Sequence, residues 1–160
     1  MVSKENIDNP DYVKSCYLFN LTKFIYWPQN AFNFSVSPFI IGIYGDASIS
    51  TALISTLRDK QIQNREWKVE HYQNIGSIQH CHILWTSSID LKEAKSLIFA
   101  TLDKEILLIG DNIQGFCNEG GMINLVGACP NFGYEINLKA LNKARLNASL
   151  ELLELATLIE

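Results

Sequence analysis

The sequence lacks the features that mark several large functional classes. No apolar run approaches the roughly 18 residues of a membrane-spanning helix, and the N-terminus, residues 1–9, lacks the apolar core of a signal peptide. The 13 Lys and Arg residues form no cluster and are outnumbered by 17 Asp and Glu, which argues against nucleic acid as a partner. The chain as given is typical of a soluble protein, although a mature secreted protein with a new start methionine would look the same.

Common catalytic motifs are also missing. The sequence holds no G-x-G-x-x-G, Walker or G-x-S-x-G motif. The turn after the first apolar strand, residues 45–48, has one glycine and an acid, so it offers no cradle for a nucleotide phosphate. The three histidines lie within twelve positions of each other, far from any obvious nucleophile. A hydrolase is therefore disfavoured.

The residues that are present predict one folded domain over 1–160, with residues 1–9 as a flexible N-terminal segment. Apolar residues make up 48% and charged residues 19% of the chain, as in a packed globular domain. Apolar periodicity and cap residues predict helices at 10–27, 49–57 and 91–102, and strands at 39–45, 67–72, 82–85 and 105–109. This alternation predicts an α/β fold with a mixed, partly parallel central sheet flanked by helices.

The stretch 115–137 predicts an antiparallel hairpin that adds strands at one side of the sheet. Two apolar runs flank a Gly/Pro/Asn cluster, with 122–126 as the first strand and a loop longer than two residues. We expect 138–160 to be helical in two pieces around 145–147. The second piece carries a wide leucine stripe that includes Leu153, which either closes the core or docks a partner.

Glu135 is the only charged residue between Gly120 and Leu138. A carboxylate in so apolar a segment is either paired, for example with a nearby lysine, or exposed for recognition. Both interpretations stay open from the residues alone.

Four cysteines allow three pairings, and none has C-x-x-C spacing. Cys117 and Cys129 flank the first hairpin strand and could form a disulfide if the chain reverses at the glycine pair 120–121; the alternative is two free thiols. His80-Cys81-His82, which His71 from a neighbouring strand could join, resembles a metal-binding pattern. We favour local hydrogen bonding for the histidines and packing for Cys81, and expect no metal.

A second functional hypothesis places a site at the mouth of the sheet. Asp46, Ser87 and Asp111 follow predicted strands, and ligands of α/β sheets tend to lie at the carboxyl ends of strands. The chain would then be a small-molecule-binding domain or an enzyme. Each of these residues is also typical of a helix cap or a turn.

Several motifs, in order and at fitting distances, resemble the YfiR/HmsC family of bacterial periplasmic proteins. The resemblance covers about residues 12 to 158. Its motifs are Lys23-Phe-Ile-Tyr-Trp-Pro28, Ile41-Gly-Ile-Tyr-Gly45, Cys81-His-Ile-Leu84, Gly120-Gly-Met-Ile123, Tyr134-Glu-Ile-Asn137, and Ser149 with Leu152-Leu153 and Leu155-Ala156.

The resemblance implies a compact, exported α/β domain that is not an enzyme and needs no cofactor. Family members bind the periplasmic sensor domain of a membrane-bound diguanylate cyclase of the YfiN type and inhibit it, which lowers cyclic di-GMP signalling and biofilm formation; they can also form homodimers. The expected location is therefore the periplasm, with the chain peripheral to the membrane only through its partner.

The family's site residues carry over to particular positions. Glu135, Leu141, Lys143 and Asn118 fall on the partner or small-ligand surface, and the stripe residue Leu153 adds an apolar contact. A redox-tuned disulfide role is implied for the cysteines.

The cysteine pattern departs from the family's. Cys81 and Cys117 match positions of disulfide cysteines, but Asn124 stands where a second hairpin cysteine is often found. Cys129 would then take the place of that second hairpin cysteine, and Cys16 is the only remaining partner for Cys81.

Overall fold

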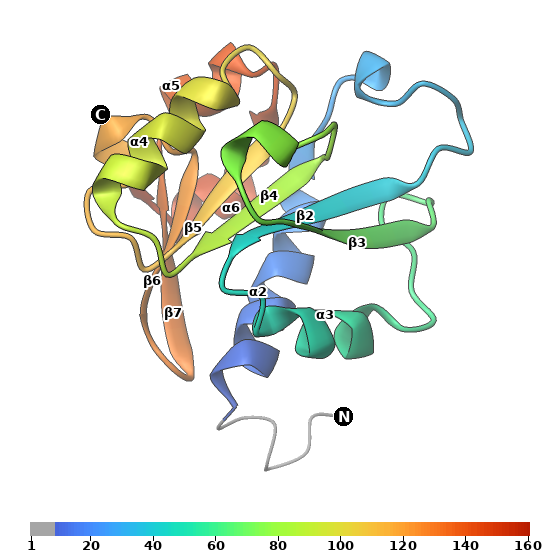
Figure 1. The fold of residues 1–160 in the computed structure, drawn as a ribbon, viewed down its shortest axis with the longest axis horizontal. Helices are drawn as coiled ribbons and strands as arrows, with labels where there is room; N and C mark the ends of the chain where they lie inside the picture. Colours follow the sequence, from blue (N-terminus) through green and yellow to red (C-terminus); the bar gives the residue numbers. More distant parts are fainter. Residues whose placement is uncertain (1–8) are drawn as a thin grey trace.

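The computed structural model describes residues 9–160 and has the mixed α/β architecture that the sequence predicts (Figure 1). The sequence predicts a flexible segment at residues 1–9, and residues 1–8 of it lie outside the described part of the chain. The helices are α2 (Pro10–Phe24), α3 (Ile49–Leu57), α4 (Leu91–Ala100), α5 (Leu138–Lys143) and α6 (Leu150–Leu155), with short 3-10 turns η1 (Gln29–Ala31), η2 (Ile75–Ser77) and η3 (Cys117–Glu119).

Seven strands form the main sheet in the order β3-β2-β4-β5-β6-β7-β9. The strands are β2 (Phe39–Gly45), β3 (Trp67–Tyr72), β4 (Ile83–Ser87), β5 (Leu107–Asp111), β6 (Ile123–Ala128), β7 (Asn131–Ile136) and β9 (Thr157–Leu158). All neighbours from β3 to β6 are parallel, β6 and β7 are antiparallel, and β9 runs parallel to β7. The predicted mixed, partly parallel sheet is confirmed.

Helices cover both faces of this sheet. Figure 1 shows α2 and α3 below the sheet and α4 above it. Asn9 caps α2 through its side chain, with Pro10 at the first helical position, as the sequence predicts. Asp90 caps α4, which buries Ala94, Leu97 and Ile98. Helices therefore cover the central strands on both faces of the sheet, which explains why the sequences of these strands are continuous apolar runs.

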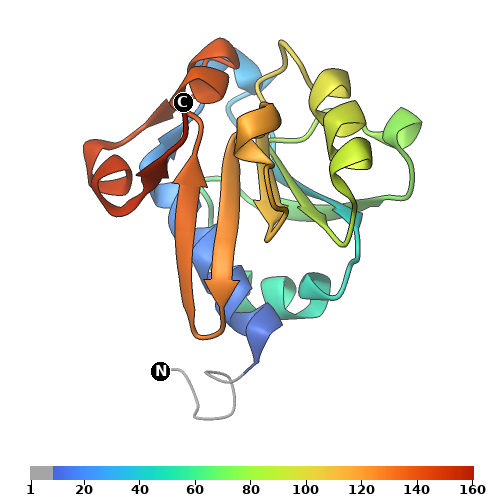
Figure 2. The ribbon, with the colours of Figure 1, turned by 90° about the vertical axis from the view of Figure 1, so that its left-hand side faces the viewer.

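A second, two-stranded sheet joins the C-terminal region to α2. In it β1 (Ile25–Tyr26) is antiparallel to β8 (Asn147–Ala148). The Ser149 amide also donates to the Phe24 carbonyl at 2.8 Å. These contacts hold α6 on the α2 side of the molecule. In Figure 2 the β6–β7 hairpin stands in front of α2, with α6 at the left.

Several details differ from the sequence prediction. The first helix ends at Phe24 and not at residue 27, because Ile25 and Tyr26 form β1. The hairpin loop is two residues long, because Ala128 pairs with Asn131 and only Cys129 and Pro130 connect the strands. The hairpin is not the edge of the sheet, since β9 adds one more strand beyond β7. The second C-terminal helix ends at Leu155, five residues before the predicted helical end at residue 160.

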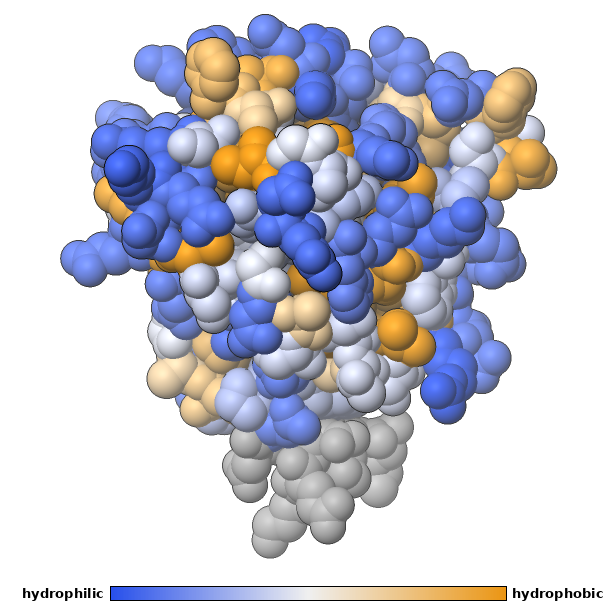
Figure 3. Space-filling view, viewed as in Figure 1, coloured by the Kyte–Doolittle hydropathy of each residue, from blue (hydrophilic) through white to orange (hydrophobic). Residues whose placement is uncertain are grey.

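The surface in the view of Figure 3 is largely hydrophilic, with separate apolar patches. One lies on the loop between η1 and β2, at the upper right, where Phe34 and Val36 are exposed. Within the described residues, no helix combines the length and the apolar character needed to cross a membrane.

Candidate functional site

The segment after β5 is anchored by one buried aromatic ring. Phe116 is completely buried, and its ring lies against Gly110 and Gly121. A Cβ atom at Gly110 would lie 2.8 Å from the Phe116 ring, and one at Gly121 would clash with it. The two glycines therefore make room for this ring. The packing fixes η3, which presents Asn118 to solvent.

The buried side chain of Asn124 connects the segment after β5 to the β6–β7 hairpin. Its side chain is 1% exposed and exchanges two hydrogen bonds with the backbone of Ile113, at 3.1 and 2.8 Å. The same amide nitrogen donates to Oε1 of Glu135 at 3.2 Å. Glu135 is half-buried, and within the described residues 9–160 its carboxylate forms no ion pair with a lysine. This asparagine fixes the direction of the Glu135 side chain.

Asn137 ties α5 to η3. Its Oδ1 accepts from the Ala140 amide at 3.0 Å and so caps α5, while its Nδ2 donates to the Cys117 carbonyl at 2.8 Å. The Cys117 thiol in turn donates to the Glu135 carbonyl at 3.5 Å. The hairpin, η3 and α5, which are separate in sequence, thereby form one connected surface on the α4 side of the sheet.

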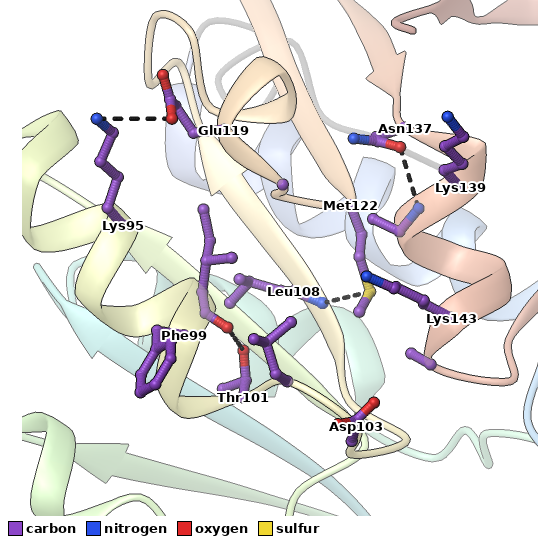
Figure 4. A pocket seen from close by; sticks show the side chains of 15 residues that line it. Lys95, Phe99, Thr101, Asp103, Leu108, Glu119, Met122, Asn137, Lys139 and Lys143 are labelled. Atoms are coloured by element: carbon purple, nitrogen blue, oxygen red, sulfur yellow. Dashed lines mark hydrogen bonds and ion pairs between the residues drawn. The ribbon is translucent and has the colours of Figure 1, made fainter.

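A groove of about 680 Å³ lies between α4, η3 and α5 (Figure 4). Its floor includes Leu108 and Met122, and the Leu108 amide donates to the Met122 sulfur at 3.5 Å. On the α4 side Phe99 is 77% exposed and Leu102 is 48% exposed. This volume is within the range of small-molecule sites.

The groove has a charged rim. The lining includes the acids Asp103 and Glu119 and the lysines Lys95, Lys139 and Lys143. Lys95 forms an ion pair with Glu119 at 3.6 Å, both side chains being well exposed. In the described residues 9–160, neither Lys139 nor Lys143 forms an ion pair. The α5 wall of the groove is therefore positively charged.

The predicted partner-binding residues do not all share one surface. Glu135, Asn118 and Lys143 belong to the hairpin, η3 and α5, which the contacts above connect. Leu141 is completely buried, so it supports α5 from the core and does not contact a partner as predicted. Leu153 is half-buried on α6, on the α2 side of the molecule and away from η3.

The structure does not contain the suggested disulfides. Cys16, Cys81 and Cys117 are free thiols, so neither the pairing of Cys117 with Cys129 nor that of Cys16 with Cys81 is present. Burial raises the pKa of both Cys81 and Cys117 to about 12, with smaller contributions from the carboxylates of Glu70 and Glu135, respectively. Both thiols are therefore protonated and unreactive at neutral pH.

The predicted residues of the sheet mouth do come together. Asp46, Ser87 and Asp111 line a polar cleft of about 410 Å³ at the carboxyl ends of β2, β4 and β5. Within it, Asp111 Oδ2 accepts from Lys14 Nζ at 2.9 Å and from Ser87 Oγ at 3.2 Å. The Asp111 side chain is only 8% exposed, and its partners come from α2 and β4. The ion pair thus attaches α2 to the sheet.

The histidines have structural hydrogen bonds. Nε2 of both His80 and His82 lies 3.0 Å from the Ala31 carbonyl, and the Ile40 amide donates to Nδ1 of His82 at 3.0 Å. His71 lies apart from them, 3.0 Å from the Ser50 hydroxyl. No group of three His, Cys, Asp or Glu side chains in residues 9–160 is arranged to hold a metal ion.

Comparison with known proteins identifies the family. The model of the YfiR/HmsC-like family matches residues 11–157, nearly the whole chain. The chain belongs to the YfiR/HmsC-like family. A search of curated proteins finds no match. Membership of the YfiR/HmsC-like family suggests a periplasmic regulator of diguanylate cyclase signalling, rather than an enzyme, that interacts with a YfiN-type sensor domain.

Sequence reasoning missed the groove and the two asparagines that shape the surface. Asn137 precedes the apolar start of α5 and so carries an N-cap signal, but its bond to Cys117 is not local. The family resemblance marks Asn124 only as a departure from a cysteine pattern, but a polar residue inside an apolar strand is itself a sign of a buried hydrogen-bond network. The groove joins α4 and α5, which have no local sequence relation.

Proposed function

We propose that the chain inhibits a membrane-bound, YfiN-type diguanylate cyclase by binding the periplasmic sensor domain of that enzyme. The contact surface consists of Glu135, Asn118 and Lys143. Inhibition lowers cyclic di-GMP and with it biofilm formation. The observation that carries this proposal is the Asn124–Glu135 hydrogen bond of 3.2 Å, which holds a carboxylate in a fixed direction beside the segment that precedes η3.

The mechanism is a population shift. A bound regulator favours an inactive state of the sensor domain only to the extent that it binds this state more tightly than the active one. A carboxylate held by a buried amide has little side-chain freedom to lose on binding, so a charged contact forms at a smaller entropic cost. Lys143 adds charge of the opposite sign on the same surface, which favours one orientation of the partner.

Redox tuning is the part of the proposal that depends on the cysteines. Cys81 and Cys117 are buried, whereas Cys16 and Cys129 are half-buried. An oxidant therefore reaches Cys16 or Cys129 before the other two. Self-association, which the family suggests, stays a prediction.

Binding to the purified periplasmic domain of the cognate cyclase tests the proposal. We expect Glu135→Lys to abolish binding, and Glu135→Gln to weaken it while keeping the oxygen that accepts from Asn124. Glu154→Lys, an exposed charge reversal on α6, is the matched control and should bind as the wild type does. Equal binding by Glu135→Lys and Glu154→Lys would place the partner elsewhere on the molecule.

A further inference from the structure

The groove between α4, η3 and α5 combines an apolar floor with a charged rim, and the charged residues of its α5 wall are all lysines. Ile98, Leu108 and Met122 supply apolar surface, and the exposed side chains of Phe99 and Leu102 extend it toward solvent. Exposed apolar side chains that converge on a concave surface indicate a site for an apolar ligand or partner.

The charges of the rim are not equivalent. The carboxylate of Glu119 is matched by Lys95 at 3.6 Å. Lys139 and Lys143 are four residues apart on α5 and so share one helix face. Figure 4 shows Lys143 extending from α5 toward Leu108 and Met122, while Lys139 lies farther along the same helix. Lys143 thus borders the apolar floor, and Lys139 lies at the outer part of the same wall; neither forms an ion pair within the described chain.

We propose that this groove binds an anionic amphiphile, a molecule with an apolar chain and one carboxylate or phosphate head. The chain lies on Leu108 and Met122, and the head is bound by Lys139 and Lys143. A lysine is a compact point charge that pairs equally well with either kind of head. The volume of about 680 Å³ accommodates a small ligand, which favours a single amphiphile over a folded partner.

Two kinds of molecule combine an apolar chain with an anionic head: a free fatty acid and an anionic phospholipid of a membrane. The site is separate from the proposed cyclase contact at Glu135, although Lys143 belongs to both surfaces. The inference requires no cyclase, and its tests use the purified full chain alone. Failure of either proposal is therefore distinguishable from failure of the other.

Titration calorimetry with dodecanoate below its micelle concentration tests the free-acid source. We expect saturable binding that Lys139→Gln/Lys143→Gln weakens at least about tenfold, because the head loses both cations. Lys68→Gln/Lys92→Gln removes the same charge from exposed positions outside the groove and should leave the affinity unchanged. Methyl dodecanoate, which has no anionic head, should bind the wild type and the groove variant equally.

A second pair of variants tests the location without touching the lysines. Leu102→Glu places an acid on the groove wall and should abolish dodecanoate binding, whereas Leu150→Glu makes the same change at an exposed leucine of α6 and should have no effect. Both sites are well exposed, so both variants should fold. Similar dodecanoate affinities for these two variants would overturn the assignment of the site.

Cosedimentation with vesicles of phosphatidylglycerol and phosphatidylethanolamine tests the phospholipid source. Vesicle binding that Lys139→Gln/Lys143→Gln removes supports a membrane lipid as the source, and binding of dodecanoate alone supports the free acid. The proposal is overturned if the wild type binds neither probe, or if the lysine variant binds both as the wild type does.

Discussion

Asn124 donates from Nδ2 to Oε1 of Glu135 at 3.2 Å, across the antiparallel pair of β6 and β7. Its other two hydrogen bonds reach the backbone of Ile113, so one buried amide joins the hairpin to the segment before η3. A hydrogen-bond network therefore holds these two segments together.

Asn124→Ala tests that network. The change leaves the amide and the carbonyl of Ile113 buried without partners, so we expect a loss of about 1–3 kcal/mol in the free energy of unfolding. Urea denaturation measures it. Asn118→Ala, an exposed control on η3, should change the stability by no more than about 0.5 kcal/mol. A stability of Asn124→Ala equal to that of the control would mean that the network contributes little.

The ion pair between Lys14 and Asp111 predicts a strong asymmetry between single and double variants. Lys14→Met leaves the Asp111 carboxylate 8% exposed with only Ser87 as a partner, and should cost about 3–5 kcal/mol. Lys14→Met/Asp111→Asn removes the buried charge and should recover part of that loss. Lys92→Met, on the exposed side of α4, is the control. If the double variant is no more stable than Lys14→Met, the unpaired charge of Asp111 is not the cause of the stability loss in Lys14→Met.

His82 predicts how stability depends on pH. Burial lowers the pKa of its imidazole from 6.5 to about 4, because the charged form is poorly solvated between Phe32 and Phe39. Between these values the unfolded chain binds a proton that the folded chain does not, so stability falls as the pH drops from about 6.5 toward 4.

Unfolding free energies at several pH values from 7 to 5 measure this effect. We expect His82→Gln to flatten the acid-side slope, whereas His71→Gln, at an exposed position, should leave the slope unchanged. An unchanged slope in His82→Gln would show that another group causes the acid sensitivity.

The buried thiols predict selective labelling. Since the pKa values of Cys81 and Cys117 are raised to about 12, both should resist a maleimide or disulfide reagent at pH 7.5 in the folded protein and react once urea unfolds it. Peptide mapping by mass spectrometry identifies the labelled positions. Rapid labelling of Cys117 without unfolding would indicate that η3 opens readily and would revive a direct redox role for that thiol.

The sequence predicted the fold well wherever the signal was local and repeated. The apolar runs of β2 and β5 and the Asn9-Pro10 start of α2 led directly to an alternating α/β chain. The predicted hairpin loop is longer than the observed one, because Gly127 adopts φ 116°, which lets β6 continue to Ala128. The strand β9 was missed because a two-residue strand has no periodicity to detect.

The site was less predictable because its contacts join distant segments. The resemblance places Leu141 on the partner surface, but the structure buries this leucine completely, and in a six-residue helix such as α5 spacing alone does not decide which leucine faces the core. The resemblance predicts partner contacts for Glu135 and Asn118, but it does not indicate the amides of Asn124 and Asn137 that connect the hairpin, η3 and α5. Those bonds depend on how the hairpin, η3 and α5 meet in space.

The most direct test of the central claim is the level of cyclic di-GMP in cells that carry the cognate cyclase and express the chain in the periplasm. Wild type and Glu154→Lys should keep the level low, and Glu135→Lys should raise it to that of cells without the protein, at equal amounts of folded protein. A low level in cells expressing Glu135→Lys would contradict the assignment of Glu135 to the inhibitory surface.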